Sequence, residues 1–311
     1  MDPMSLRAVL IEAFAAAPCQ GNGAAVVLLD EPLADPAMQA IAGSLRQSET
    51  AFLLQHKGQW LLRWFTPTCE VPLCGHATLA SLLALGHWGV LAPGSGLAFH
   101  SRSGPLEVAL DPLQPGRGAI VLPAYPIHSA SPSDQLSQHL AEVSGAPVER
   151  YWTSDLGYHV ALLPPGSSLD GLDALATTLE GPARNGLVVM AAVDPGDPQA
   201  PALEGSKADY QLRFFAPGLG IPEDPVTGSA HALVAPYWLG ATAAATVVGW
   251  QPSTRPGGMV CSAASSGMIR LLGSGHLLWD GTLHYAPSST GGSARGESSN
   301  WAGWEALLPP G

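Results

Sequence analysis

The apolar residues of this 311-residue chain fall into short runs that are separated by Gly, Pro and polar residues. Short runs rich in β-branched and aromatic residues, with turn residues on both sides, are typical of β-strands. The abundant Gly and Pro lie mostly between the runs, which indicates many turns rather than disorder. Strands are predicted at 6–14, 24–29, 50–54, 59–65, 97–103, 106–110 and 119–122, and then at 158–163, 187–193, 210–216, 246–251, 258–262 and 268–272.

Two helical segments differ from the other predicted helices because they have almost no polar face. They cover 77–85 and the apolar run at 233–238. A helix that is apolar on all sides is buried on all sides. The helix at 77–85 is therefore predicted to be the core of its domain, wrapped by strands. A more polar helix is predicted at 37–45, with Asp35 as its N-cap.

The chain contains an internal repeat of a strand, a loop and a helix start. Residues 62–67 (Leu-Arg-Trp-Phe-Thr-Pro) align with residues 212–217 (Leu-Arg-Phe-Phe-Ala-Pro). After a loop that is longer in the second copy, residues 74–77 (Cys-Gly-His-Ala) align with residues 227–230 (Thr-Gly-Ser-Ala). Matching pieces in the same order favour duplication over chance. The sequence predicts an α/β fold of two similar domains, whose helix N-termini would face one cleft.

The domain boundaries are predicted from the polar, proline-containing segment at 123–133, which is typical of a linker. The N-terminal half is predicted to cover 1–125 and the C-terminal half 134–285. The remaining residues, 286–311, form a Ser/Gly-rich tail with an apolar patch at 301–304. The sequence leaves open whether this patch docks or whether the tail is loose.

Charge and composition exclude several classes of partner. The formal net charge is −12, so a nucleic acid or an anionic membrane surface is not expected as a partner. No apolar stretch is long enough to span a membrane, and the N-terminus lacks a signal peptide. Reduced thiols and a cytoplasmic location are therefore expected for a chain with four cysteines. A small anionic substrate remains compatible with the charge, because a local group of backbone N–H donors can bind one.

The two repeated helix starts are the predicted anion-binding elements. Unpaired N–H groups and the helix dipole favour an anion there, at Gly75 in the first copy and at Gly228 and Ser229 in the second. Three titratable side chains lie near them in sequence: Glu49, His76 and Asp224.

Each of these side chains also has a purely structural interpretation. Glu49 lies where a helix ends and a strand begins, so desolvation is expected to raise its pKa toward a value useful for proton transfer. Alone, it would be read as a surface glutamate. His76 could donate to a substrate oxygen or be structural, and Asp224 could orient a partner or cap a turn.

Two other kinds of site are disfavoured by spacing. Cys74, His76 and His231 show none of the paired spacings of common metal sites, so no metal is expected. Ser229 lies in Gly-Ser-Ala, which lacks the Gly-x-Ser-x-Gly form of a hydrolase nucleophile.

Five segments together resemble the PhzF-like (phenazine-biosynthesis-like) family. They are Gly-Asn-Gly-Ala-Ala-Val-Val-Leu-Leu at 21–29, Ser-Glu-Thr-Ala-Phe-Leu at 48–53, Leu-Cys-Gly-His-Ala-Thr at 73–78, Glu-Asp-Pro-Val-Thr-Gly-Ser-Ala-His at 223–231 and Gln-Pro-Ser-Thr-Arg-Pro-Gly-Gly at 251–258. The resemblance implies the diaminopimelate-epimerase fold, with two pseudo-symmetric α/β halves. Each half is a strand barrel around a central helix, and the site lies between them.

The resemblance also implies an isomerase that needs no metal and no organic cofactor and that forms a homodimer. In the phenazine enzyme, a glutamate matching Glu49 moves a proton between carbons of a dihydro-hydroxyanthranilate, which is a small cyclic carboxylate. The other implied site residues position the substrate or bind its carboxylate: His76, Asp224, Ser229, Gly75 and Gly228.

Departures from the pattern keep other functions open. The epimerases of this fold use two cysteines, whose places hold Cys74 and Thr227 here, and a threonine cannot serve as a second thiol base. A racemase or epimerase that uses Cys74 as one base stays an alternative, as does a non-catalytic protein that binds a ligand. Arg46, close to Glu49 in sequence, could lower the pKa of that carboxyl or bind a second anion.

Overall fold

The computed structural model describes residues 4–265, 267–286, 300–301 and 303–308. Contacts divide the chain into two compact units. Unit 1 consists of Met1–Ala13, Gly23–Ile120 and Ser274–Gly311, and unit 2 of Phe14–Asn22 and Val121–Gly273. The continuous halves predicted from the sequence differ from this division because each unit takes one segment from the other end of the chain.

Unit 1 is a strongly curved sheet. β2 and β3 are parallel, β3 and β4 antiparallel, and β4 and β6 parallel again. β6–β7 and β7–β8 are antiparallel, and β1 pairs with β2 and with β19. The strands are β1 (Met4–Ala13), β2 (Asn22–Leu29), β3 (Glu49–His56), β4 (Gln59–Phe65), β5 (Glu70–Val71), β6 (Gly96–Ser101), β7 (Gly104–Leu110), β8 (Arg117–Pro123) and β19 (Met268–Tyr285).

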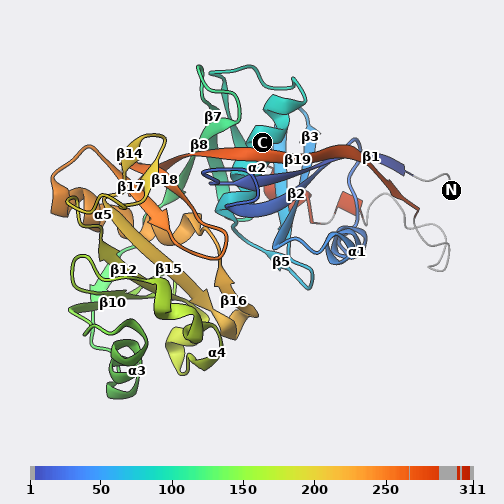
Figure 1. Cartoon of the computed structure of the whole chain (residues 1–311). Helices are drawn as coiled ribbons and strands as arrows, with labels where there is room; N and C mark the ends of the chain where they lie inside the picture. Colours follow the sequence, from blue (N-terminus) through green and yellow to red (C-terminus); the bar gives the residue numbers. More distant parts are fainter. Residues whose placement is uncertain (1–3, 266, 287–299, 302, 309–311) are drawn as a thin grey trace. The chain divides into compact units, whose positions relative to one another are not determined.

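The helix α2 (Gly75–His87) fills the inside of this sheet and contacts β1, β3 and β7 (Figure 1). Every residue from Gly75 to Leu85 is buried, which confirms the prediction for 77–85. The polar side chains of Thr78 and Ser81 donate to the carbonyls of Cys74 and Ala77, one turn earlier. The helix can therefore be buried without leaving these hydroxyls unpaired.

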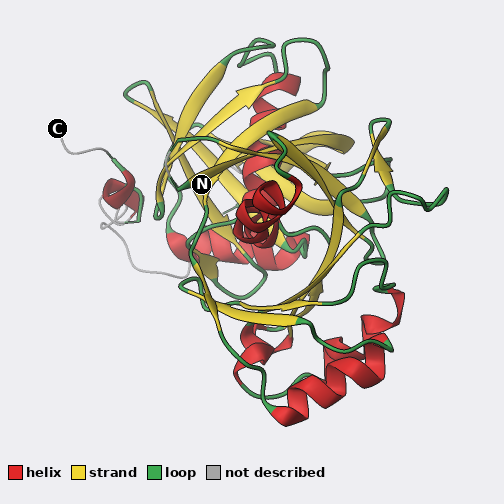
Figure 2. Cartoon of the chain, turned by 90° about the vertical axis from the view of Figure 1, so that its left-hand side faces the viewer, coloured by secondary structure: helices red, strands yellow, loops and turns green. Residues whose placement is uncertain are grey.

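Unit 2 has its own strands and a second buried helix, α5 (Gly228–Thr242), which packs on β17 and β18. β11–β12 and β15–β17 are parallel, whereas β10–β11, β12–β15, β17–β18 and β18–β19 are antiparallel. The strands are β9 (Ile127–Ser129), β10 (Arg150–Ser154), β11 (His159–Leu162), β12 (Leu187–Ala192), β15 (Tyr210–Ala216), β16 (Ile221–Asp224), β17 (Thr246–Gln251) and β18 (Gly257–Ala263). In Figure 2 strands curve around a helix seen nearly end-on, in a mixed α/β fold with a β-barrel and additional strands.

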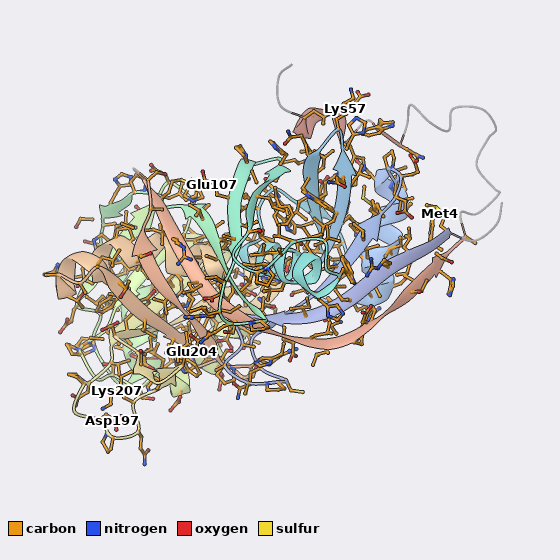
Figure 3. The ribbon with its side chains drawn as sticks, turned by 90° about the horizontal axis from the view of Figure 1, so that it is seen from above. Met4, Lys57, Glu107, Asp197, Glu204 and Lys207 are labelled. Atoms are coloured by element: carbon orange, nitrogen blue, oxygen red, sulfur yellow. The ribbon has the colours of Figure 1, made fainter. Side chains whose placement is uncertain are left out.

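The remaining elements lie at the periphery of their units. In the β13–β14 hairpin, Lys207 donates to the carbonyls of Pro195 and Asp197, and Figure 3 shows Lys207 beside Asp197. No helix among the described residues combines the length and apolar character that a membrane crossing requires. The peripheral elements are α1 (Asp35–Leu45), α3 (Asp134–Ser144), α4 (Leu175–Thr178), β13 (Ala202–Leu203), β14 (Ser206–Lys207) and the 3-10 helices η1 (Asp170–Ala174), η2 (Pro182–Asn185), η3 (Pro217–Leu219) and η4 (Glu305–Leu307).

A buried arginine occupies the same place in both copies of the repeat. In β4, Arg63 donates Nε and Nη2 to the two carboxylate oxygens of Glu70, each at 2.7 Å. In β15, Arg213 makes the same bidentate pair with Glu223, again at 2.7 Å. The repeated Leu-Arg-aromatic-Phe segment therefore carries a repeated ion pair.

Each arginine also holds an aspartate from a neighbouring helical segment. Arg63 donates to Asp35 at 2.8 Å, and Arg213 donates to Asp173 at 2.5 Å. The prediction that Asp35 is the N-cap of the helix at 37–45 is wrong, because Ala34 is the N-cap. Asp35 lies in the first helical turn, where its side chain pairs with Arg63.

Trp301 and Trp304, from the apolar patch predicted at 301–304, pack in the core of unit 1. Trp304 is fully buried, and its Nε1 donates to the carbonyl of Leu33 at 3.1 Å. The ring of Trp301 contacts His56 edge-on, with ring centroids 4.4 Å apart. The rest of the predicted tail at 287–299 lies outside the described residues.

Candidate functional site

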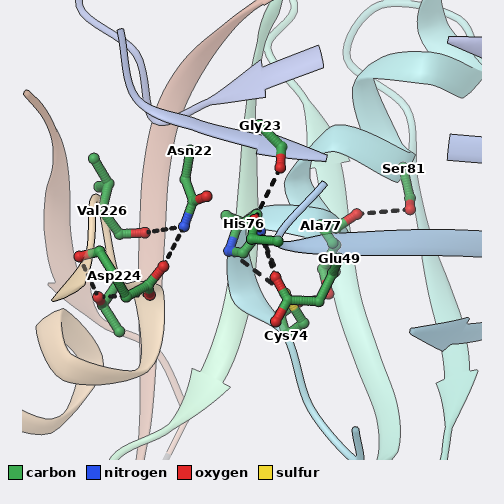
Figure 4. Close-up of polar contacts among 12 residues, drawn as sticks. Asn22, Gly23, Glu49, Cys74, His76, Ala77, Ser81, Asp224 and Val226 are labelled. Atoms are coloured by element: carbon green, nitrogen blue, oxygen red, sulfur yellow. Dashed lines mark hydrogen bonds and ion pairs between the residues drawn. The ribbon is translucent and has the colours of Figure 1, made fainter. Parts of the chain in front are cut away.

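Unit 1 brings Glu49 and His76 together at the start of α2. Glu49 is the first residue of β3, beside Ala24 of the parallel strand β2, and His76 is the second residue of α2. Their Oε2 and Nε2 atoms are 3.0 Å apart, and both side chains are almost completely buried (Figure 4). The surface-loop interpretation of Glu49 therefore does not apply.

Cys74 and Ser48 complete the polar surroundings of His76. The Cys74 Sγ atom is 3.5 Å from His76 Nδ1 and 3.7 Å from Nε2. Ser48 donates its hydroxyl to the carbonyl of Gly23 at 3.0 Å and presents Oγ to His76 Nε2 at 3.2 Å. One side-chain atom from each of Glu49, Cys74 and His76 lies within 4.8 Å of the others. We call these three residues the Glu49–Cys74–His76 cluster.

The charges in this cluster are set by its burial and its contacts. Burial raises the pKa of Glu49, but the charge of His76 and hydrogen bonds from His76, Ser48 and Cys74 outweigh it, so the pKa is lowered overall. The expectation of a raised pKa is therefore wrong. Burial alone would lower the pKa of His76, but Cys74 and Glu49 raise it well above its ordinary value. Burial raises the pKa of Cys74 to about 11. The pair is a carboxylate and an imidazolium beside a neutral thiol.

The start of α5 in unit 2 carries a network of neutral donors around a carboxylate. Asp224, the last residue of β16, accepts from Asn22 Nδ2 on Oδ1 at 2.5 Å and from Thr227 Oγ1 on Oδ2 at 2.7 Å. Asn22 also donates to the carbonyl of Val226 at 3.2 Å. Figure 4 shows these contacts. The carboxylate of Asp224 is thus held in place on both of its oxygens.

Gln251 supports this network from inside unit 2, whereas the His231 side chain contacts Tyr210. Gln251 is fully buried, accepts from the N–H of Thr227 at 2.9 Å and donates to the carbonyl of Asp224. His231 contacts the Tyr210 hydroxyl through Nδ1 at 2.9 Å, and burial lowers its pKa to about 3. His231 is therefore a neutral core residue.

The two helix starts themselves are similar. Gly75 and Gly228 are the first residues of α2 and α5, and both are buried. The preceding N-cap residues, Cys74 and Thr227, make no side-chain capping bond in the structure as described. Ser229 Oγ lies 3.4 Å from the Tyr158 hydroxyl. Anion binding at the two helix starts stays a prediction.

Comparison with known proteins identifies the family. Residues 11–271 match the family described as phenazine biosynthesis-like protein. The chain belongs to the phenazine biosynthesis-like family. A Pseudomonas aeruginosa protein named as an uncharacterized isomerase is 34% identical over 282 residues, covering 90% of this chain and 100% of that protein.

Solved structures agree with this membership. A PhzF-family structure from Enterococcus faecalis is 29% identical with a TM-score of 0.74, covering 90% of this chain and 99% of that one. A probable proline racemase from Agrobacterium radiobacter shares the fold at 11% identity, with a TM-score of 0.57 and 95% of each chain covered. The resemblance seen in the sequence motifs is confirmed.

In this phenazine biosynthesis-like chain, three supporting residues escaped sequence-based selection: Asn22, Ser48 and Gln251. Each lies in a motif segment that carries the family resemblance, and that was the available signal. The neighbouring acidic residues Glu223 and Asp224 precede α5 but have different partners. Glu223 is bound by Arg213, and only Asp224 belongs to the network.

Arg46 is not among the groups that lower the pKa of Glu49, whereas binding of a second anion by Arg46 stays a prediction. It caps α1 in the left-handed conformation, and the groups that lower the pKa of Glu49 are His76, Ser48 and Cys74.

Proposed function

We propose that this phenazine biosynthesis-like protein is an isomerase that moves a proton on a small, cyclic, carboxylate-bearing metabolite, without a metal or organic cofactor. Glu49 is the acid and base of the reaction. The observation that carries the proposal is the buried contact between Glu49 Oε2 and His76 Nε2, 3.0 Å apart. A second support is that the Pseudomonas aeruginosa relative bears the name isomerase.

The proposed mechanism uses the ion pair as a switch on the basicity of Glu49. In the free protein His76 keeps the Glu49 carboxylate ionised, which makes it a weak base. A substrate oxygen that takes the hydrogen bond of His76 removes this stabilisation, so burial raises the pKa of Glu49 and strengthens it as a base. Glu49 then takes a proton from one carbon and returns it to another.

The second unit supplies binding rather than proton transfer in this proposal. Asp224, fixed by Asn22 and Thr227, orients the substrate through a donor group. Ser229 and the N–H groups at Gly75 and Gly228 bind the substrate carboxylate, as helix starts favour anions.

The racemase alternative is less well supported by the chemistry of Cys74. A base must be deprotonated, and burial raises the pKa of this thiol to about 11. Thr227 in the matching place offers no second thiol.

Two further expectations stay predictions here. We propose that the units are pseudo-symmetric halves, each a barrel around its helix, because β2–β3–β4–β6–β7 and β11–β12–β15–β17–β18 pair in the same parallel and antiparallel order. A homodimer in the cytoplasm is also proposed, as the resemblance implies. Light scattering on the purified protein tests the dimer.

The function is tested by hydrogen exchange on candidate substrates. The wild-type protein is incubated in D₂O with a set of cyclic carboxylic acids that includes dihydro-hydroxyanthranilate, and deuterium at carbon is followed by NMR. We expect incorporation into at least one acid with the wild type and none with Glu49→Gln. Equal incorporation by both proteins would exclude Glu49 as the acid and base.

A further inference from the structure

We propose that the Glu49–Cys74–His76 cluster is a binding site for Zn²⁺ and similar thiophilic divalent ions, and that such an ion switches off proton transfer. The loss of proton transfer rests on the proposed function, whereas binding of the ion does not.

The donor set of the cluster matches the preferences of zinc. Zn²⁺ is bound in proteins by cysteine sulfur, histidine nitrogen and carboxylate oxygen. Here the sulfur comes from the N-cap of α2, the nitrogen from its second residue and the oxygen from the start of β3. All three residues are buried, and their donor atoms lie within 4.8 Å of one another. The sequence spacing did not indicate this set of ligands, because Glu49 and Cys74 are far apart along the chain.

The spacing of the donor atoms fits a single tetrahedral ion. Zinc bonds of about 2.3 Å to sulfur and about 2.0–2.2 Å to nitrogen and oxygen place S and N about 3.5 Å apart and N and O about 3.3 Å apart. In the cluster, Cys74 Sγ and His76 Nε2 are 3.7 Å apart, and His76 Nε2 and Glu49 Oε2 are 3.0 Å apart. Because Cys74 Sγ lies 3.5 Å from Nδ1 as well as 3.7 Å from Nε2, binding the ion requires the imidazole or the thiol to rotate until the Nε2 lone pair and the sulfur face one point.

Binding exchanges two protons for one ion. The ion displaces the proton on His76 Nε2 and the proton on Cys74 Sγ, both go to solvent, and no atom is oxidised or reduced. Three protein ligands leave the fourth position for water, as in open zinc sites. Glu49 then donates its lone pair to the metal and can no longer accept a proton from carbon. Mg²⁺ and Ca²⁺ are excluded because they prefer all-oxygen sites.

The test uses Co²⁺ as a spectroscopic probe and Zn²⁺ as its competitor on chelator-treated protein. Thiolate ligation of Co²⁺ gives a near-ultraviolet charge-transfer band. We expect one equivalent of Co²⁺ to produce this band in the wild type, Zn²⁺ to abolish it and Mg²⁺ to leave it unchanged. Cys74→Ser should lose the band. Cys69→Ser, which removes an exposed cysteine of the same unit, should keep it.

Three results would overturn the site: no band in the wild type, a band that survives in Cys74→Ser, or a band that depends on Cys69. Glu49→Gln provides a second variant, with the band retained and the Zn²⁺ affinity lowered by about tenfold or more. An unchanged affinity in Glu49→Gln removes the carboxylate from the site. Because this test uses no substrate, its failure is separate from failure of the proposed function. Deuterium exchange that continues in Zn²⁺-loaded protein overturns only the proposal that the ion switches off proton transfer.

Discussion

The starts of α2 and α5 occupy the same place in two similar units but carry different chemistry. At α2, a carboxylate and an imidazolium face each other beside a thiol. At α5, a carboxylate is held by the neutral donors of Asn22 and Thr227. Leu187 pairs with Phe215 of β15 as Thr50 pairs with Phe65 of β4, so the residue that corresponds to Glu49 by strand pairing is Gly186, which has no ionisable side chain. One unit therefore carries a titrating pair where the other carries a fixed network.

The framework around the two helix starts has stayed alike. Arg63 and Arg213 make the same bidentate pair with Glu70 and Glu223, and each guanidinium lies 5.2 Å from the ring of a phenylalanine two residues later. At the helix starts, the units therefore differ in their side chains and not in this arginine framework. This division of labour underlies the proposal that one unit moves a proton and the other holds the substrate.

The largest expected effect on stability tests the shared framework. Arg63→Met leaves the mostly buried Glu70 with only the half-exposed Arg102, and Arg213→Met removes the arginine that binds both oxygens of the mostly buried Glu223, so each should lower the free energy of unfolding by about 3–5 kcal/mol. Chemical denaturation measures both. Arg102→Met is the matched control, because Arg102 also contacts Glu70 but is half-exposed, and it should cost less than about 1 kcal/mol. If Arg63→Met and Arg213→Met lower the free energy of unfolding as little as Arg102→Met does, the two arginine pairs are not a common structural framework.

A smaller effect tests the fixed network at α5. Thr227→Val removes the hydroxyl that donates to Asp224 Oδ2, so it should cost about 1–3 kcal/mol, whereas Thr227→Ser keeps the donor and should cost less. Thermal or urea unfolding of the two variants makes the comparison. If valine and serine are equally stable at this position, the Thr227 hydroxyl does not hold Asp224.

The smallest effect separates the two units by pH. The raised pKa of His76 contributes stability that is complete below pH 6.5 and is lost as pH rises through its pKa in the folded protein. Glu49, with a lowered pKa, contributes above pH 4.5 and loses its contribution at lower pH. The pKa of His231 is lowered to about 3, so this residue makes the folded protein less stable as pH falls below 6.5.

The pH response is measured as the free energy of unfolding across this range. Each group changes it by no more than about 1.4 kcal/mol per pH unit. Glu49→Gln should reduce the decline above pH 6.5, and His231→Phe should reduce the decline below it. The reverse assignment would mean that the titrating pair and the neutral histidine have been exchanged between the units.

The sequence predicted features that depend on local pattern. The strands and the buried helix at 77–85 follow from the pattern of apolar residues, the repeat follows from residues that match in the same order, and the structure contains all three. The length of a strand was harder to predict than its presence. The strand predicted at 268–272 continues to Tyr285 as β19 because it pairs with β1, a partner from the other end of the chain.

The side-chain contacts depend on residues far apart in sequence, and these could not be predicted. Asn22 meets Asp224 across 202 residues, and Trp304 meets Leu33 across 271. The pKa of Glu49 was expected in the wrong direction because its contact with His76 was unknown. Only the family motifs indicated that Glu49 and His76 belong to one site.

The most direct test of the central claim separates proton transfer from binding. For an acid that the wild type labels in D₂O, exchange rate and dissociation constant are measured for Glu49→Gln and Asp224→Asn. We predict that Glu49→Gln lowers exchange by about 10²–10⁴-fold with little change in affinity, whereas Asp224→Asn mainly weakens binding. Retained exchange in Glu49→Gln, or lost exchange with unchanged affinity in Asp224→Asn, would contradict the account.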